Sequence, residues 1–163
     1  MSSRFAVLLA LGLGTACGPK HLVSGVIDAD PDAGNDRKRA VLVESSGARH
    51  PLALSGDALW LADLGGCSVQ IEGRDAVRRL VVDRWLVTDA GDGSQPYIGI
   101  LERSGLQYQL RDRHSGAAII LAADSVGALQ HEVDRPVLVA GYFAGPNRLH
   151  VVSWRVLRDL PGP

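Results

Sequence analysis

The chain has 163 residues, of which 46% are hydrophobic, 21% charged and 5% aromatic. This length and composition suffice for one ordinary domain or two very small ones, and they exclude a disordered chain. No apolar run approaches the roughly 20 residues that a membrane-spanning helix needs. Seventeen basic and eighteen acidic residues give a net charge of -1, so no charge excess points to a nucleic-acid partner.

The first sixteen residues have the layout of a secretory signal peptide. Arg4 supplies a positive charge, residues 5–13 form a short apolar core, and residues 14–16 are small, as a cleavage site requires. The apolar core is too short to cross a bilayer, and no stop-transfer sequence follows it. We therefore predict that residues 1–16 are a cleaved signal peptide, in preference to a buried N-terminal helix or strand.

The segment Leu13-Gly14-Thr15-Ala16-Cys17 resembles the lipobox of bacterial lipoproteins. In that family an apolar residue and two small ones precede a cysteine, which becomes the first mature residue and carries a diacylglycerol. The family usually has leucine three residues before the cysteine, where this chain has Gly14. The resemblance implies lipidation of Cys17 and a short tether over residues 17–20.

The residue after the lipidated cysteine bears on location. In bacterial lipoproteins an aspartate there retains the protein at the inner membrane, and this chain has Gly18 instead. The resemblance therefore implies an outer-membrane lipoprotein, facing the periplasm or the cell surface. Gly14 and Ala16 would also suit ordinary signal peptidase, so a secreted protein without lipid remains the alternative.

The only other cysteine is Cys67, between Gly66 and Ser68. If Cys17 is acylated, Cys67 is expected to be a small buried thiol. Without lipidation, a disulfide between the two cysteines becomes possible in an oxidising compartment. A catalytic thiol would need a nearby base, and the sequence indicates none.

Three pairs of segments in the rest of the chain match at a nearly constant offset, which indicates a tandem repeat. The clearest pair shares five of nine positions, including a tryptophan. In chain order, residues 51–54 leading to Asp57 match residues 119–121 leading to Asp124, residues 69–73 match 137–141, and residues 79–87 match 148–156.

Each repeat is predicted to hold three strands, a short helix and two more strands, from runs of β-branched and apolar residues between turn formers. In the first repeat the strands are residues 22–27, 39–44, 51–54, 68–72 and 79–87, with a helix over 58–64 capped by Asp57. In the second they are residues 97–101, 107–111, 117–121, 136–140 and 148–157, with a helix from near Asp124. The last strand of each repeat breaks strict alternation before its tryptophan, which predicts a bulge there.

This order of elements resembles the OB-fold, a five-stranded Greek-key barrel. We therefore predict an all-β protein of two tandem OB-like barrels, each with one short helix. The barrels span residues 21–88 and 96–157, with a linker over 89–95 and a C-terminal tail over 158–163. A single larger sandwich or barrel in which both repeats share one core is the alternative, and an interface between the repeats is expected either way.

Trp85 and Trp154 occupy equivalent positions in the two repeats. We predict that both rings are buried in equivalent surroundings, where each fills its barrel or packs the repeats together. The alternative is a stacking platform for a base or a sugar, which would need exposed rings beside positive charge.

One acidic segment resembles the start of a calcium-binding loop, in which alternate carboxylates converge on one cation. Its carboxylates are Asp28, Asp30, Asp32 and Asp36. The loop pattern requires glycine at its sixth position and glutamate at its twelfth, whereas this chain has Gly34 at the seventh and Arg39 at the twelfth. A solvated acidic loop between two strands is therefore the favoured interpretation.

No nucleophile, base and orienting group occur at a recognisable spacing, and no cofactor or metal is predicted. The five histidines, His21, His50, His114, His131 and His150, are scattered without metal-ligand spacing. We therefore favour a non-catalytic binding or scaffold lipoprotein of the cell envelope, with an envelope protein or a glycan as partner. The alternative is a small envelope enzyme with a site assembled from His50, Asp57 and His114.

Overall fold

The computed structural model describes residues 18–29, 39–113 and 115–160. These residues form ten strands and three short helical segments, so the prediction of an all-β protein is confirmed. The first five strands are β1 (Lys20–Ala29), β2 (Ala40–Val43), β3 (Arg49–Ala53), β4 (Ser68–Ala76) and β5 (Arg79–Asp89). The second five are β6 (Gln95–Ser104), β7 (Gln107–Asp112), β8 (Ala118–Leu121), β9 (Pro136–Gly145) and β10 (Arg148–Val156).

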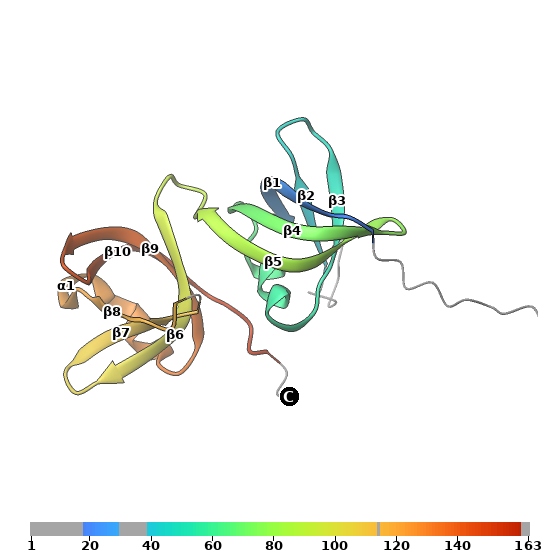
Figure 1. The fold of residues 1–163 in the computed structure, drawn as a ribbon. Coiled ribbons are helices and arrows are strands. Elements are labelled where there is room, and N and C mark those ends of the chain that lie inside the picture. Colours follow the sequence, from blue (N-terminus) through green and yellow to red (C-terminus); the bar gives the residue numbers. More distant parts are fainter. Residues whose placement is uncertain (1–17, 30–38, 114, 161–163) are drawn as a thin grey trace, which may run out of the picture.

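The strands form two five-stranded sheets, and each sheet closes on itself into a barrel. In the first barrel the neighbours run β1-β2-β3-β5-β4, with β4 returning to pair with β1. In the second barrel they run β6-β7-β8-β10-β9, and β9 pairs with β6. The strand order is therefore the same in both halves of the chain, and the two barrels lie side by side (Figure 1).

A bulge interrupts the last strand of each barrel, as the sequence predicts. Glu72 faces Arg84 while Gly73 faces Val82, which leaves Asp83 as the extra residue of β5. In β10 the extra residue is Val152, at the equivalent position of the repeat. The bulge moves the following tryptophan to the same face as the apolar residues before it, although the sequence does not alternate there.

Each repeat has a short helical segment near the predicted place, but the start of the first differs from the prediction. The first is a 3-10 helix, η1 (Gly56–Asp63), which begins after Ser55, so the prediction that Asp57 caps this helix is wrong. The Asp57 side chain instead accepts hydrogen bonds from Arg113 and Trp85. In the second barrel, α1 (Ala123–Val126) lasts one turn and continues as the 3-10 helix η2 (Gly127–Glu132).

The buried apolar side chains form two clusters, one within each barrel. The alternative of a single shared core is therefore wrong. The cluster of the first barrel also takes in four residues from the second half of the chain, namely Ile98, Leu138, Ala140 and Leu157. The outer surface of β6 and β9 thus packs against the first barrel, and the expected interface between the repeats is confirmed.

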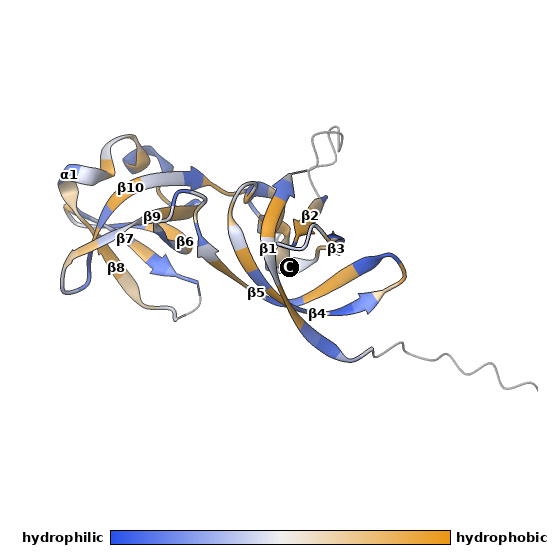
Figure 2. Ribbon diagram, turned by 90° about the horizontal axis from the view of Figure 1, so that it is seen from above, coloured by the Kyte–Doolittle hydropathy of each residue, from blue (hydrophilic) through white to orange (hydrophobic). Residues whose placement is uncertain are grey.

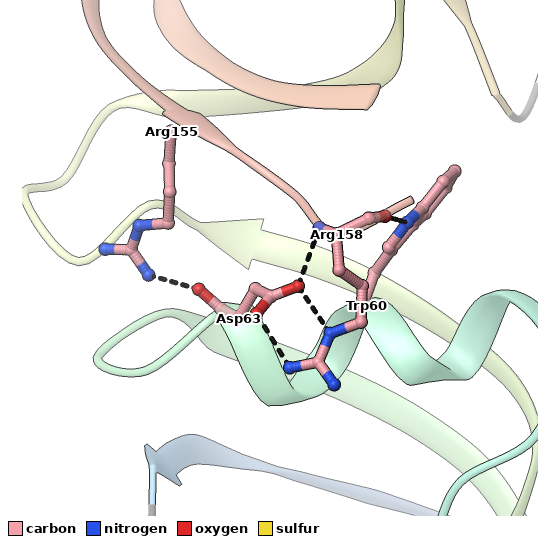
Figure 3. A network of polar contacts seen from close by, with 4 residues as sticks. All are labelled: Trp60, Asp63, Arg155 and Arg158. Atoms are coloured by element: carbon pink, nitrogen blue, oxygen red, sulfur yellow. Dashed lines mark hydrogen bonds and ion pairs between the residues drawn. The ribbon is translucent and has the colours of Figure 1, made fainter. Parts of the chain in front are cut away.

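A polar network adds to this apolar interface (Figure 3). Arg158, which follows β10, donates to the Asp63 carboxylate from its backbone nitrogen at 2.9 Å, from Nε at 2.8 Å and from Nη2 at 2.7 Å. Trp60 Nε1 donates to the carbonyl oxygen of Arg158 at 2.8 Å. Arg155 Nη1 donates to the carbonyl oxygens of Asp63 and Gly65. These bonds link the C-terminal segment to η1 and hold the barrels together.

Removing the Asp63 carboxylate is expected to lower the free energy of unfolding by about 1–3 kcal/mol. Asp63→Ala would leave the half-buried Arg158 guanidinium and its backbone nitrogen without their acceptor, and hydrogen bonds to charged groups are worth about this much. Denaturant unfolding would measure the loss. The exposed Asp159 is the matched control, because its alanine variant should stay within about 0.5 kcal/mol of the parent. Equal stability of the two variants would contradict the role given to this network.

Candidate functional site: an aromatic ribbon on the second barrel

A groove of about 420 Å³ lies where the first barrel meets Arg113, which follows β7. The Arg113 guanidinium lies 4.3 Å from the ring centroid of Trp85 and 5.4 Å from that of Trp60, and it pairs with Asp57. Stacking on two indole rings and pairing with a carboxylate hold this arginine in place. Arg113 thus joins the second barrel to the first.

Two further carboxylates of the groove, Asp83 and Glu72, are also paired. Asp83 accepts a hydrogen bond from Arg74 Nη2 at 2.8 Å, and Lys20 Nζ lies 3.4 Å from Asp83 and 3.3 Å from Glu72. The hydrogen bond from Arg74 lowers the pKa of Asp83, so this carboxylate stays ionised at neutral pH. A general acid or base works best with a pKa near the operating pH. The groove therefore favours ion pairing over proton transfer.

Two of the three residues of the enzyme hypothesis, His50 and Asp57, lie in the described part of the chain, and these two do not meet. His50 lies in β3, with its Nε2 atom 2.5 Å from the Glu44 carboxylate. Asp57 lies in the groove with Arg113, whereas His50 lines a different pocket. His114 is outside the described residues. The structure therefore does not bring His50 and Asp57 together as a candidate catalytic site.

The two equivalent tryptophans have different surroundings, so the prediction that both are buried is only half correct. Trp85 is 5% exposed and belongs to the first apolar cluster, whereas Trp154 is 37% exposed. Trp85 is covered by Arg113 and donates from Nε1 to Asp57. No described residue stacks on Trp154 or accepts a hydrogen bond from it, which leaves part of its ring in contact with solvent.

Trp154 is one of four exposed large apolar residues on the paired strands β9 and β10. Together we call them the aromatic ribbon: Tyr142, Phe143, Val152 and Trp154, which are 58%, 48%, 59% and 37% exposed. They lie on both faces of the strand pair, since Tyr142 and Phe143 are consecutive in β9 and point in opposite directions. Tyr142 pairs with His150 across the two strands, and their rings stack at a centroid distance of 5.0 Å. Phe143 meets Tyr97 edge to face at 5.7 Å. Ring contacts of this kind fix the orientation of side chains that would otherwise move freely in water.

The same strand positions in the first barrel carry charge. Arg74 and Asp75 correspond to Tyr142 and Phe143, and the bulge residue Asp83 corresponds to Val152. In the first barrel Arg74 and Asp83 form an ion pair across the strands. The two barrels share the same strand order, yet one has charged side chains at these positions and the other has aromatic and apolar ones. The fold itself therefore does not require the exposed aromatic side chains.

Sequence reasoning singled out Trp154 but missed the other members of the aromatic ribbon. The alignment of the repeats contains the signal, since it sets Tyr142 and Phe143 against Arg74 and Asp75. Their exposure could not be read from the sequence, because aromatic residues in a β-strand are usually expected to face the core.

The calcium-like segment lies mostly outside the described residues. Asp28 ends β1 and accepts a hydrogen bond from Arg49 Nη2 at 2.7 Å. Asp30, Asp32 and Asp36 fall within residues 30–38, which the structure does not describe. Among the residues that it does describe, no group of three or more His, Cys, Asp or Glu side chains could hold a metal ion. The same part of the chain has no helix long and apolar enough to span a bilayer.

Cys67 is a free, fully buried cysteine whose sulfur lies 3.4 Å from the carbonyl oxygen of Ala90. It precedes β4, whereas Gly18 lies beside Asp75 near the other end of that strand. Cys17 lies outside the described residues, so the alternative of a disulfide between the two cysteines stays a prediction.

The Cys67 thiol is expected to resist alkylation in the folded protein. Burial raises its pKa, so little reactive thiolate forms at neutral pH, and the sulfur has no contact with solvent. Mass spectrometry after treatment with iodoacetamide should find residue 67 unmodified in buffer and modified in denaturant. Rapid modification of this residue in buffer would contradict the burial.

No protein-family model matches the chain, and no curated protein does either.

Proposed function

We propose that this protein is a membrane-anchored, non-catalytic binding lipoprotein of the bacterial outer membrane, which recognises a protein partner through the aromatic ribbon. The anchor is the lipid on Cys17, and the signal peptide and lipobox-like sequence that support it lie outside the described residues. The strand order of each barrel, with a helical segment between its third and fourth strands, supports tandem OB-like Greek-key barrels.

The observation that carries this proposal is the difference between the repeats at equivalent strand positions. The first barrel has paired charges there, and the second has exposed aromatic and apolar side chains. Exposed aromatic and apolar side chains that gather on one pair of strands can mark a binding surface. Because the fold accepts charge at these positions, binding is the best reason for the aromatic residues.

The chemistry of the aromatic ribbon favours a protein over a glycan. Centres of protein interfaces are rich in tyrosine, phenylalanine and tryptophan and poor in acidic residues. The aromatic ribbon has this composition, and all four of its members are uncharged. The alternative ligand is a glycan that stacks on the aromatic rings, and an experiment must distinguish it from a protein partner.

Metabolic labelling with palmitate tests the anchor. The full-length chain should incorporate label, and Cys17→Ser should abolish the incorporation. Cys67→Ser is the matched control, because residue 67 is buried and its replacement should leave labelling unchanged. Labelling that survives Cys17→Ser would contradict the proposed anchor.

Photo-crosslinking in cells tests the binding surface. A photoreactive residue at Tyr142 should give one defined adduct with another protein, and a second change, Val152→Asp, should abolish it by placing charge in the contact. The same photoreactive residue at the exposed Leu106, on the hairpin between β6 and β7, is the control and should give no such adduct. An adduct with a glycan, an adduct with a second copy of this chain, or identical products at both positions would contradict the proposal.

A further inference from the structure

The hairpin that joins β4 to β5 forms one end of the first barrel. Its last strand pair is Ala76 with Arg79, and Val77 and Arg78 make the turn. The Val77 side chain is 92% exposed, and both arginines are exposed as well. The tip of this hairpin therefore presents one apolar side chain between two long basic ones.

The charges of these two arginines are not neutralised within the described part of the chain. The side chains of Arg78 and Arg79 form no ion pair or hydrogen bond with any described residue. The other basic residues nearby are paired: Lys20 with Glu72 and Asp83, and Arg49 with Asp28. The nearest carboxylate along the hairpin, Asp75, lies 3.7 Å from His21. The hairpin tip thus carries two positive charges that no described carboxylate neutralises.

The described chain starts beside this hairpin. A Cβ atom added to Gly18 would lie 3.5 Å from the backbone oxygen of Asp75, and both views of the ribbon show the start of β1 next to the β4–β5 turn (Figures 1 and 2). Cys17 precedes Gly18 by one peptide bond, so the Cα atoms are about 3.8 Å apart. A lipid on Cys17 would therefore enter the bilayer close to the hairpin tip.

We propose that the tip of the β4–β5 hairpin, Val77, Arg78 and Arg79, rests on an anionic membrane surface beside the lipid anchor. This inference depends on the lipid anchor that is part of the proposed function. The two guanidinium groups attract anionic headgroups, and each basic residue near such a surface favours contact about fivefold. Val77 can enter the boundary between headgroups and acyl chains at little cost.

The contact would set the direction in which the molecule points. The hairpin lies at the start of β5, and the connection to the second barrel follows the end of the same strand at Asp89. Ten residue steps of strand separate these ends by about 33 Å. The second barrel and its aromatic ribbon would therefore face away from the membrane, where a partner can reach them.

The test uses the full-length lipidated protein, reconstituted into vesicles and labelled with an environment-sensitive fluorophore. Val77→Cys places the label at the hairpin tip, and Leu106→Cys is the matched control on another hairpin tip with nearly equal exposure, 91%. Cys67 is buried and should not take the label. In vesicles of phosphatidylcholine and phosphatidylglycerol, the emission should shift to the blue at residue 77 and stay unchanged at residue 106.

The double variant Arg78→Gln, Arg79→Gln should lower the ratio of contacting to free hairpins about 25-fold, and high salt should act in the same direction. Equal emission at residues 77 and 106, or equal emission at residue 77 in vesicles with and without phosphatidylglycerol, would overturn the inference. Failure of the proposed anchor would look different, because the protein would then neither incorporate palmitate nor float with the vesicles.

Discussion

Replacing Trp85 with alanine is expected to lower the free energy of unfolding by about 3–5 kcal/mol. The indole ring is 5% exposed, lies in the apolar cluster of the first barrel and stacks on the Arg113 guanidinium. Its removal would leave a cavity and would also deprive Arg113 of a stacking partner at the boundary of the barrels. The equivalent change, Trp154→Ala, should cost only about 1 kcal/mol, since that ring is partly exposed already.

Chemical denaturation followed by circular dichroism would measure both losses without depending on the tryptophan emission that the variants remove. Trp154→Ala is the internal control, because it deletes the same side chain from the same position of the repeat. Equal losses in the two variants would contradict the different surroundings of the rings. In addition, Trp154→Ala should reduce crosslinking from Tyr142, whereas an effect on stability alone would argue against a role of Trp154 in binding.

Gly73→Ala and Gly141→Ala are expected to destabilise the protein by about 3 kcal/mol each. These glycines lie opposite the bulges of β5 and β10, where the paired strand approaches closely. A Cβ atom at residue 73 would overlap the backbone oxygen of Val81, and one at residue 141 would overlap that of His150. Backbone cannot move aside as a flexible side chain can, so the strands would have to separate.

Gly145→Ala is the matched control, since it also lies in β9 but a Cβ atom there would meet nothing within 4 Å. This variant should stay within about 0.5 kcal/mol of the parent protein in denaturant unfolding. If Gly141→Ala and Gly145→Ala unfold at the same denaturant concentration, the close approach of the strands at residue 141 is wrong.

The sequence by itself determined the all-β class, the strands and the position of both bulges. Alternation of apolar and polar residues depends only on the two-residue period of a strand, which is local. The break in this alternation before Trp85 and Trp154 is equally local, and an extra residue in the strand is the simple way to restore it. Tandem repetition follows from comparing the chain with itself.

The tertiary structure alone decided which side chains are buried. Trp85 and Trp154 have equivalent places in the chain, but Arg113 and Asp57 cover only the first, from elements 28 residues away in each direction. For the same reason Asp57 bonds to Arg113 and Trp85 instead of capping a helix. The tertiary structure likewise decides that the aromatic ribbon is exposed and that the two arginines at the tip of the β4–β5 hairpin have no acidic partner among the described residues. Exposure is set by neighbours distant in sequence, and no local pattern records which neighbours those are.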